Sequence, residues 1–368
     1  MFGSRNTGWL HKNKMSLALL GNEGFSDLLD EFLTVFEPYA RLYFKKRKTE
    51  LNKYPELIGR FYEDLWDISA GGKRLRGFLV YLGYLVGGRS DLEKILPISL
   101  AIETIHTFLL IHDDVIDKSD TRHGKLTIHR RLEKLFGAHY GMSQAIIVGD
   151  IACFEAFALV NSSRLSAQAK VECQKKIYEV LLETAYGEAL DVENSYKKAS
   201  VDDIKQVTDL KTARYSFVGP LAIGAILAGK ASSNQLDAIS KFGRLVGVAF
   251  QLQDDLLGLF GDEKVLGKSV LSDMREGKNT LVIYKARELA TNSDRQMLST
   301  LWGKQTASKA DLITVQEIVK RSGAYVWCTG EMDRLNKKAN MCRSLISKDK
   351  NIQTIFAQMA QFIVSRRS

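Results

Sequence analysis

The chain has 368 residues, 45% hydrophobic and 26% charged, which is the composition of a soluble globular protein able to bury a sizeable core. The net charge of +9 admits nucleic acid, an anionic membrane or phosphorylated small molecules as partners, but no nucleic-acid motif accompanies it, so we expect no nucleic-acid partner. The 4 cysteines are far apart and form no CxxC pair, which argues against a zinc site or a disulfide framework and favours a reducing cytoplasm.

The N-terminal stretch MFGSRNTGWLHKNK has little periodicity and precedes a second methionine, Met15. We expect a disordered arm over residues 1–22. No repeat, low-complexity tract or Pro/Gly/Ser linker divides residues 23–368, so we expect one domain there. The apolar segment that follows Lys14 is too short for a signal sequence or a membrane span, and we predict neither export nor membrane insertion.

Hydrophobic residues recur with helical spacing along most of the chain, and only 4 prolines interrupt it. The pattern predicts helices over 24–46, 55–69, 73–87, 92–117, 142–162, 166–195, 201–229 and 233–260, with more toward the C-terminus. Glycine stops and serine or asparagine caps lie between them, as in GGRSD at 87–91 and AGKASSN at 228–234. The protein is predicted to be mainly helical.

The stretch LLIHDDVID, residues 109–117, puts three aspartates after an apolar helical run. On a helix Asp113 and Asp117 lie on one face, and Asp114 lies roughly 100° around the axis. Two carboxylates on one face repel each other, and burial makes the repulsion worse unless a cation neutralises them. Their oxygens suit Mg²⁺. Taken alone, the motif is more typical of a solvated acidic helix end.

A second acidic pair, Asp254 and Asp255, lies in FQLQDDLLGLFGDEKVLGKSV, residues 250–270, again at the C-terminal end of an apolar helical run. Negative charge at a helix C-terminus opposes the macrodipole, so both placements require a compensating cation. Two facing carboxylate clusters could hold several Mg²⁺ ions around one diphosphate.

Basic residues that could bind a diphosphate occur in several segments. They are Lys73, Arg74 and Arg76 of GGKRLRG, Arg122 and His123 of DTRHG, Lys211, and Lys268 and Lys278 of GKSVLSDMREGK. The GGK at 71–73 is not a Walker A loop, and a plain helix boundary remains the alternative for its glycines.

Seven motifs follow one another along the chain: GGKRLRG, IHTFLLIHDDVID, TRHGKLTIH, GEALD, KTA, FQLQDDLLGLFGD and GKSVLSDMREGKNTL. With these motifs in this order, the chain resembles the trans (E-type) isoprenyl diphosphate synthases, or polyprenyl synthetases, from about residue 25 to 290. The resemblance implies an all-α, single-domain fold of long helices around a deep central cavity, usually as a homodimer. It implies a Mg²⁺-dependent prenyltransferase that joins isopentenyl diphosphate head-to-tail to allylic diphosphates.

The resemblance also implies roles for individual residues. Asp113, Asp117 and Asp254 would hold Mg²⁺, supported by Asp114 and Asp255. Lys73, Arg76 and His106 would bind isopentenyl diphosphate, Arg122, Lys211, Lys268 and Lys278 would bind the allylic diphosphate, and Thr212 and Gln251 would line the reacting carbons.

Three positions depart from the family pattern. His123 stands where the family usually has a second arginine that binds isopentenyl diphosphate, so binding there is expected to be weaker or pH-dependent. Gly258 replaces the frequent third aspartate of the second motif, with Asp262 nearby, and Glu188 replaces a frequent glutamine, a mild difference.

Phe108 is the residue from which we predict product length. It lies five residues before Asp113, roughly 7.5 Å along the helix, where a bulky side chain can block a growing tail. An aromatic there, with no insertion in the first motif, resembles geranylgeranyl (C20) synthases more than farnesyl (C15) synthases, and longer products stay open. The alternative is that Phe108 packs in the core and a deeper residue sets the length.

Other functions match only parts of the sequence. A class I terpene cyclase also uses DDxxD and Mg²⁺, but its second motif is of the NSE/DTE kind and it lacks a site like GGKRLR. A non-catalytic subunit of a heteromeric synthase typically lacks aspartates or lysines that are present here. The terminal SRRS, residues 365–368, is expected to be a frayed end rather than a cover over the site.

Overall fold

The structure is a computed structural model that describes residues 24–70, 72–122, 124–197, 199–263 and 269–365. The first helices are α1 (Phe25–Glu50), α2 (Glu56–Ser69), α3 (Leu75–Val86), α4 (Leu92–Ile116), α5 (Ile128–Phe136), α6 (Ala138–Ser162) and α7 (Ala167–Tyr196). A two-residue antiparallel hairpin, β1 (Thr121–Arg122) and β2 (Lys125–Leu126), precedes α5. The predicted N-terminal arm lies outside the described residues.

The second half of the chain continues in the same way. It contains α8 (Val201–Val207), the π-helix η3 (Thr208–Val218), α9 (Gly219–Ala228), α10 (Ser233–Phe260), α12 (Ser272–Glu276), α13 (Leu281–Leu289), α14 (Asn292–Leu301), α15 (Lys309–Arg321), α16 (Ala324–Asn340), α17 (Arg343–Ile346) and α18 (Lys350–Ser365). The predicted all-α fold class is confirmed.

Helix ends follow the capping chemistry of the sequence. The Ser232 hydroxyl accepts a hydrogen bond from the backbone N–H of Gln235 and begins α10, and Gly229, with φ of 75°, ends α9. Both residues belong to the predicted AGKASSN boundary.

The prediction of one continuous helix over 201–229 is wrong in one respect, because the π-helix η3 interrupts it. Pro220 has no N–H to donate to the carbonyl of Ser216, so one α-helical hydrogen bond is missing where η3 passes into α9. Neighbouring helices also approach η3 closely: a Cβ on Gly187 of α7 would lie 2.6 Å from the backbone nitrogen of Lys211, and one on Gly247 of α10 would lie 2.4 Å from the Ala213 Cα.

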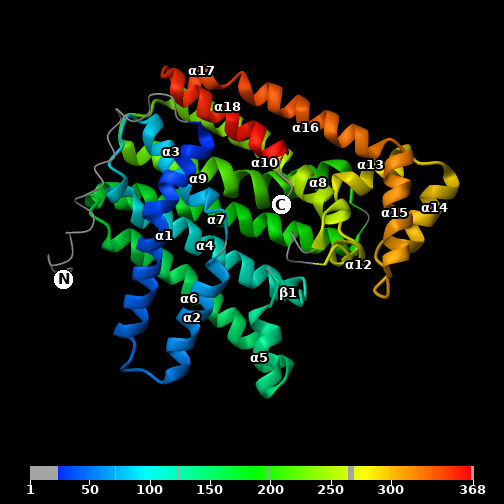
Figure 1. The fold of residues 1–368 in the computed structure, drawn as a ribbon, viewed down its shortest axis with the longest axis horizontal. Coiled ribbons are helices and arrows are strands. Elements are labelled where there is room, and N and C mark those ends of the chain that lie inside the picture. The colour runs from blue at the N-terminus through cyan, green and yellow to red at the C-terminus, as the bar shows by residue number, and fades with distance from the viewer. Residues whose placement is uncertain (1–23, 71, 123, 198, 264–268, 366–368) are drawn as a thin grey trace.

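The helices enclose two adjoining cores that share α10. The larger core includes Phe32, Leu79 and Phe242, and the smaller one, which includes Leu252 and Val315, lies at the end formed by α12 to α15. In Figure 1, α16 and α18 run along one side, while α5 and the β1–β2 hairpin project from the opposite side. The long helix α10 therefore connects the N-terminal helices to the C-terminal ones.

Within the part of the chain that the structure describes, two helices, α4 and α6, are long and apolar enough to cross a membrane by length and composition alone. The apolar window of α4 is 67% buried within the protein, whereas that of α6 is only 44% buried. Helix α4 is thus a core helix, and α6 leaves an apolar face exposed. The absence of membrane insertion stays a prediction.

Candidate active site

The first acidic motif lies at the C-terminal end of α4, on the wall of a cavity of about 800 Å³. Asp113 and Asp117 line this cavity together, as their helical spacing predicts. Opposite walls are supplied by α7, through Glu188 and Asp191, and by the segment around α12. The acidic cavity therefore forms where three separate parts of the chain meet.

Lys211 of η3 neutralises one side of this cavity. Its Nζ lies 3.2 Å from Asp113 Oδ1, 2.7 Å from Glu188 Oε2 and 2.8 Å from Asp191 Oδ2. Burial lowers the pKa of Lys211, but these three carboxylates raise it by more, and the net shift is upward. The lysine is therefore charged throughout the physiological pH range.

Lys278, which follows α12, neutralises the other side. Its Nζ lies 2.9 Å from Asp117 Oδ2, 3.1 Å from Glu276 Oε2 and 3.9 Å from Asp273 Oδ1. Burial raises the pKa of Glu276 to about 7, although Lys278 acts in the opposite direction. Lys278 thus joins the first motif to a segment more than 150 residues later in the chain.

The ionisation of Asp113 depends on these cations. Burial alone would raise its pKa, but Lys211, Lys278 and Arg122 together hold the pKa below its ordinary value. The compensating positive charge that the sequence requires for the first motif is supplied in this structure by side chains.

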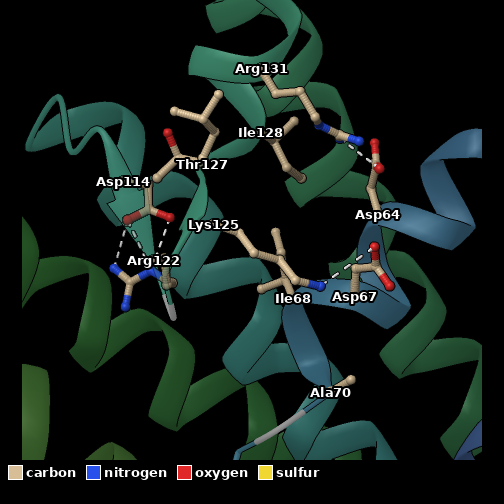
Figure 2. A pocket seen from close by; sticks show the side chains of 11 residues that line it. Asp64, Asp67, Ile68, Ala70, Asp114, Arg122, Lys125, Thr127, Ile128 and Arg131 are labelled. Atoms are coloured by element: carbon tan, nitrogen blue, oxygen red, sulfur yellow. Dashed lines mark hydrogen bonds and ion pairs between the residues drawn. The ribbon is translucent and has the colours of Figure 1, made fainter. Parts of the chain in front are cut away.

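The Asp114 side chain points toward Arg122, as Figure 2 shows. It is buried, and both of its oxygens accept hydrogen bonds from Arg122 of β1: Nε lies 2.9 Å from each, and Nη2 lies 2.7 Å from Oδ1. This pair borders a second cavity of about 570 Å³ between α2, the hairpin and α5, across which Arg131 pairs with Asp64 at 2.6 Å. Arg122 also reaches Asp113, with Nη2 at 3.3 Å from Oδ2.

The second acidic motif lies near the C-terminal end of α10, with Asp254 half-buried and Asp255 buried. The Gln251 side chain donates to Asp255 Oδ1 at 2.8 Å and accepts from Thr212 Oγ1 at 2.7 Å. Because Thr212 follows Lys211, these contacts connect the second motif through η3 to Asp113.

Gly258 lies one turn after Asp254 and faces the segment of α12. A Cβ at Gly258 would lie only 2.4 Å from Asp273 Oδ2, so the carboxylate of Asp273 fills the space that a side chain at 258 would occupy. The departure at Gly258 therefore leaves no gap beside the second motif.

The basic residues at the start of α3 lie beside α4, η3 and α18. Arg76 Nη1 lies 3.1 Å from His106 Nε2, and Arg76 Nη2 donates to Ser216 Oγ at 2.8 Å. Lys73 Nζ lies 5.6 Å from the centre of the Phe362 ring of α18. Two of the three residues predicted to bind isopentenyl diphosphate are thus brought together, while the predicted ligands His123 and Lys268 lie outside the described residues.

Phe108 is partly buried and packs against the larger core. Its ring makes an edge-to-face contact with His112 at 4.7 Å, and His112 fits against Gly149, where a Cβ would lie 2.3 Å from the His112 Cδ2. Five residues of helix turn Phe108 roughly 140° away from Asp113, so the two side chains do not share a face.

Several residues of the site were missed by sequence reasoning. Asp191 stands one turn after Glu188 in GEALD, and Asp273 and Glu276 lie in GKSVLSDMREGK beside the predicted lysines. Their spacing was a usable signal, because carboxylates one turn apart on a helix share a face.

The donor chemistry of the cavity fits a divalent cation that shares its ligands with a substrate. Within the described ranges no group of three or more His, Cys, Asp or Glu side chains is arranged to hold a metal ion by itself. Mg²⁺ usually takes only one or two protein carboxylates and completes its shell with water and phosphate oxygens. Asp113 and Asp117, on the same cavity wall, match that requirement.

Comparisons with known proteins agree with this geometry. The polyprenyl synthetase family model matches residues 58–319. The short chain isoprenyl diphosphate synthase of Methanocaldococcus jannaschii is 31% identical over 88% of this chain and 94% of its own, and the geranylgeranyl diphosphate synthase of Sulfolobus acidocaldarius is 34% identical over 72% and 78%.

Solved structures lead to the same family. The geranylgeranyl pyrophosphate synthase of Corynebacterium glutamicum, complexed with isoprenyl diphosphate and magnesium, superposes with a TM-score of 0.86 at 29% identity and covers 92% of this chain and 99% of its own. The farnesyl diphosphate synthase of T. brucei, at 17% identity and a TM-score of 0.79, shares the fold. The chain belongs to the polyprenyl synthetase family.

Proposed function

We propose that this short-chain prenyl diphosphate synthase is Mg²⁺-dependent and condenses isopentenyl diphosphate head-to-tail with allylic diphosphates to make geranylgeranyl diphosphate (C20). One observation carries the proposal: Lys211 and Lys278, from distant parts of the chain, pair with Asp113 and Asp117, which line one cavity. Carboxylates and cations alternating around a cavity are what a diphosphate–metal complex requires.

The allylic diphosphate is assigned to this cavity. Asp113 and Asp117, with Asp254 from α10, would hold Mg²⁺, which supplies Lewis-acid stabilisation of the charge that develops on the leaving diphosphate. Lys211 and Lys278 exchange their carboxylate partners for phosphate oxygens when the diphosphate enters. Both remain protonated, so they stabilise negative charge in the transition state without transferring a proton.

Isopentenyl diphosphate is assigned to the basic residues at the start of α3 and to His106 of α4. Arg76 and His106, in contact at 3.1 Å, would bind its phosphates, with Lys73 as the third ligand. Gln251, whose side-chain oxygen accepts a hydrogen bond from Thr212 Oγ1 at 2.7 Å, would line the reacting carbons together with Thr212. No side-chain nucleophile is needed, because the departing diphosphate accepts the proton lost from the new prenyl chain.

The C20 product is the finer part of the proposal and rests on Phe108. The contact with His112, which is itself held against Gly149, restricts the movement of the Phe108 ring. The named relatives span several lengths at similar identity: the Micrococcus luteus farnesyl diphosphate synthase is 31% identical and the Aeropyrum pernix geranylfarnesyl diphosphate synthase is 35% identical. A farnesyl (C15) or longer product is therefore the alternative.

A homodimer is proposed from the exposed face of α6 and α7. Phe154 is 70% exposed, and Ile147, Val171 and Tyr178 are also large exposed apolar residues on these two helices. Soluble proteins rarely leave such apolar patches uncovered. A second copy that presents the same face would cover them by an isologous contact.

Product analysis tests the proposed function. The purified protein would be incubated with Mg²⁺, labelled isopentenyl diphosphate and either dimethylallyl, geranyl or farnesyl diphosphate, and product lengths would be read after dephosphorylation. A C20 product from each accepted primer supports the proposal. A C15 product, or products beyond C20, would support the condensation activity but overturn the C20 assignment. No elongation with any primer would overturn both the activity and the C20 assignment.

A further inference from the structure

The three basic side chains of GGKRLRG, those of Lys73, Arg74 and Arg76, contact different helices of the protein. Lys73 lies over Phe362 of α18, and Arg76 contacts α4 and η3. Arg74, between them, turns in another direction and reaches α1. Only Lys73 and Arg76 have a role in the proposed function, and the reaction described above makes no use of Arg74.

Arg74 adopts a backbone conformation that is unfavourable for its type. Its φ of 51° and ψ of 28° are left-handed, and Lys118 is the other non-glycine residue with positive φ in the described ranges. Side chains with a Cβ avoid this region, and glycine adopts it freely. The Arg74 carbonyl accepts the hydrogen bond from the Phe78 N–H at 2.9 Å, so the strained residue lies directly at the start of α3.

The Arg74 guanidinium makes two kinds of contact, an ion pair with Glu37 and a cation–π contact with Phe36. Nε lies 2.6 Å from Glu37 Oε1 and Nη2 lies 3.3 Å from Oε2, a two-point ion pair. The guanidinium carbon lies 5.6 Å from the centre of the Phe36 ring. The Arg74 side chain is 3% exposed and that of Glu37 is 39% exposed, so the arginine is buried while the glutamate lies at the surface of α1. A planar guanidinium held in this way cannot rotate freely.

We propose that Arg74 and Glu37 are positioning residues for isopentenyl diphosphate. Their ion pair holds the turn before α3 in its left-handed conformation, and this turn sets the positions of Lys73 on one side and Arg76 on the other. A relaxed turn separates the two cations that must reach one diphosphate. This inference rests on the proposed assignment of Lys73 and Arg76 to isopentenyl diphosphate, and it adds residues that do not touch the substrate.

The test compares Glu37→Gln, Arg74→Gly and the double variant with a matched control. Glu37→Gln removes the charge without changing the backbone. Arg74→Gly permits the left-handed conformation but removes the anchor, so it separates the ion pair from backbone strain. The control is Glu50→Gln, on the same helix, where Glu50 is 43% exposed and pairs with Arg47 at 2.8 Å.

Michaelis constants for the two substrates provide the readout, with thermal unfolding to verify folding. We expect Glu37→Gln and Arg74→Gly to raise the KM for isopentenyl diphosphate about tenfold, the effect of one weakened ionic hydrogen bond. The allylic KM and kcat should stay within about twofold, and the double variant should resemble Arg74→Gly because both changes remove one interaction. Glu50→Gln should change none of these values.

The outcomes separate this inference from the proposed function. An equal rise in both Michaelis constants, or no rise in either, would overturn the positioning role. If the wild-type protein elongates and Lys73→Ala raises the KM for isopentenyl diphosphate while the Glu37 and Arg74 variants do not, only the present inference fails. If the wild-type protein does not elongate, the proposed function fails. Should Arg74→Gly not fold, Glu37→Gln decides alone.

Discussion

Replacing Lys211 by glutamine should destabilise the metal-free protein. The substitution leaves Asp113, Glu188 and Asp191 facing one another, all within 3.2 Å of the former ammonium position. Glutamine retains hydrogen-bond donors and a similar helix propensity, so the change isolates the charge.

The magnitude follows from burial. Lys211 is 22% exposed and Asp191, the most accessible of its partners, is 30% exposed. Removing one member of a buried ion pair costs about 3–5 kcal/mol, and this partly solvated cluster belongs at the lower end. An unfolding entropy of about 2 cal/mol/K per residue gives about 0.8 kcal/mol/K for the chain, so the melting temperature should fall by about 4 °C.

The loss should depend on pH and on Mg²⁺. Burial raises the pKa of Glu188 and Lys211 opposes this rise, so without Lys211 the pKa rises further and ionising Glu188 costs more stability as pH increases. The difference from wild type should therefore be largest near pH 8 and smaller near pH 5. Added Mg²⁺ should also reduce it, because a cation again lies among the carboxylates.

Thermal unfolding in EDTA, at both pH values and then with Mg²⁺, checks this prediction. The control is Lys205→Gln, since Lys205 is 60% exposed and lies 3.9 Å from Asp202, and it should change stability by less than about 0.5 kcal/mol. A Lys211→Gln melting temperature within about 1 °C of wild type in EDTA at pH 8, or a larger loss at pH 5, would refute the reasoning.

Three further predictions concern other parts of the molecule. Gly224→Ala would place a Cβ 1.9 Å from the Val80 carbonyl oxygen and should lower the free energy of unfolding, measured with denaturant, by at least about 1–3 kcal/mol. The control Gly330→Ala, whose Cβ would have no neighbour within 4 Å, should stabilise helix α16 slightly. Equal effects of the two substitutions would contradict the close packing of α3 on α9. Phe108→Ala should lengthen the product when chain length is read by chromatography, and an unchanged length would assign the limit to a deeper residue. Phe154→Glu should shift sedimentation from dimer toward monomer, and an unchanged dimer would place the interface elsewhere.

Much of the helical framework could be predicted because hydrophobic periodicity and caps are local signals. The helix predicted over 233–260 has the bounds of α10, and its cap at Ser232 was visible in the sequence. The hairpin and α5 were not predicted, although α5 is amphipathic, because the segment is short and rich in charge. The π-helix η3 is packed closely by Gly187 and Gly247, and contacts between helices so distant in sequence are not revealed by local pattern.

The site could be predicted in its residue types but not in its pairings. The spacing of Asp113 and Asp117 on one face follows from helix geometry alone. That Lys278 would pair with Asp117, 161 residues away, depends on the tertiary fold. Arg74 belonged to a recognisable basic motif, yet its left-handed backbone and its contact with Glu37 are features that no linear pattern contains.

The central claim is that both acidic motifs serve one Mg²⁺-dependent condensation. The most direct measurement is incorporation of labelled isopentenyl diphosphate by wild type, Asp113→Asn, Asp254→Asn and the control Asp237→Asn on α10, each with Mg²⁺ and with EDTA. We predict incorporation by wild type and Asp237→Asn only with Mg²⁺, and losses of at least about 100-fold in the two motif variants. Incorporation in EDTA, or a variant of either motif as active as wild type, would contradict the account.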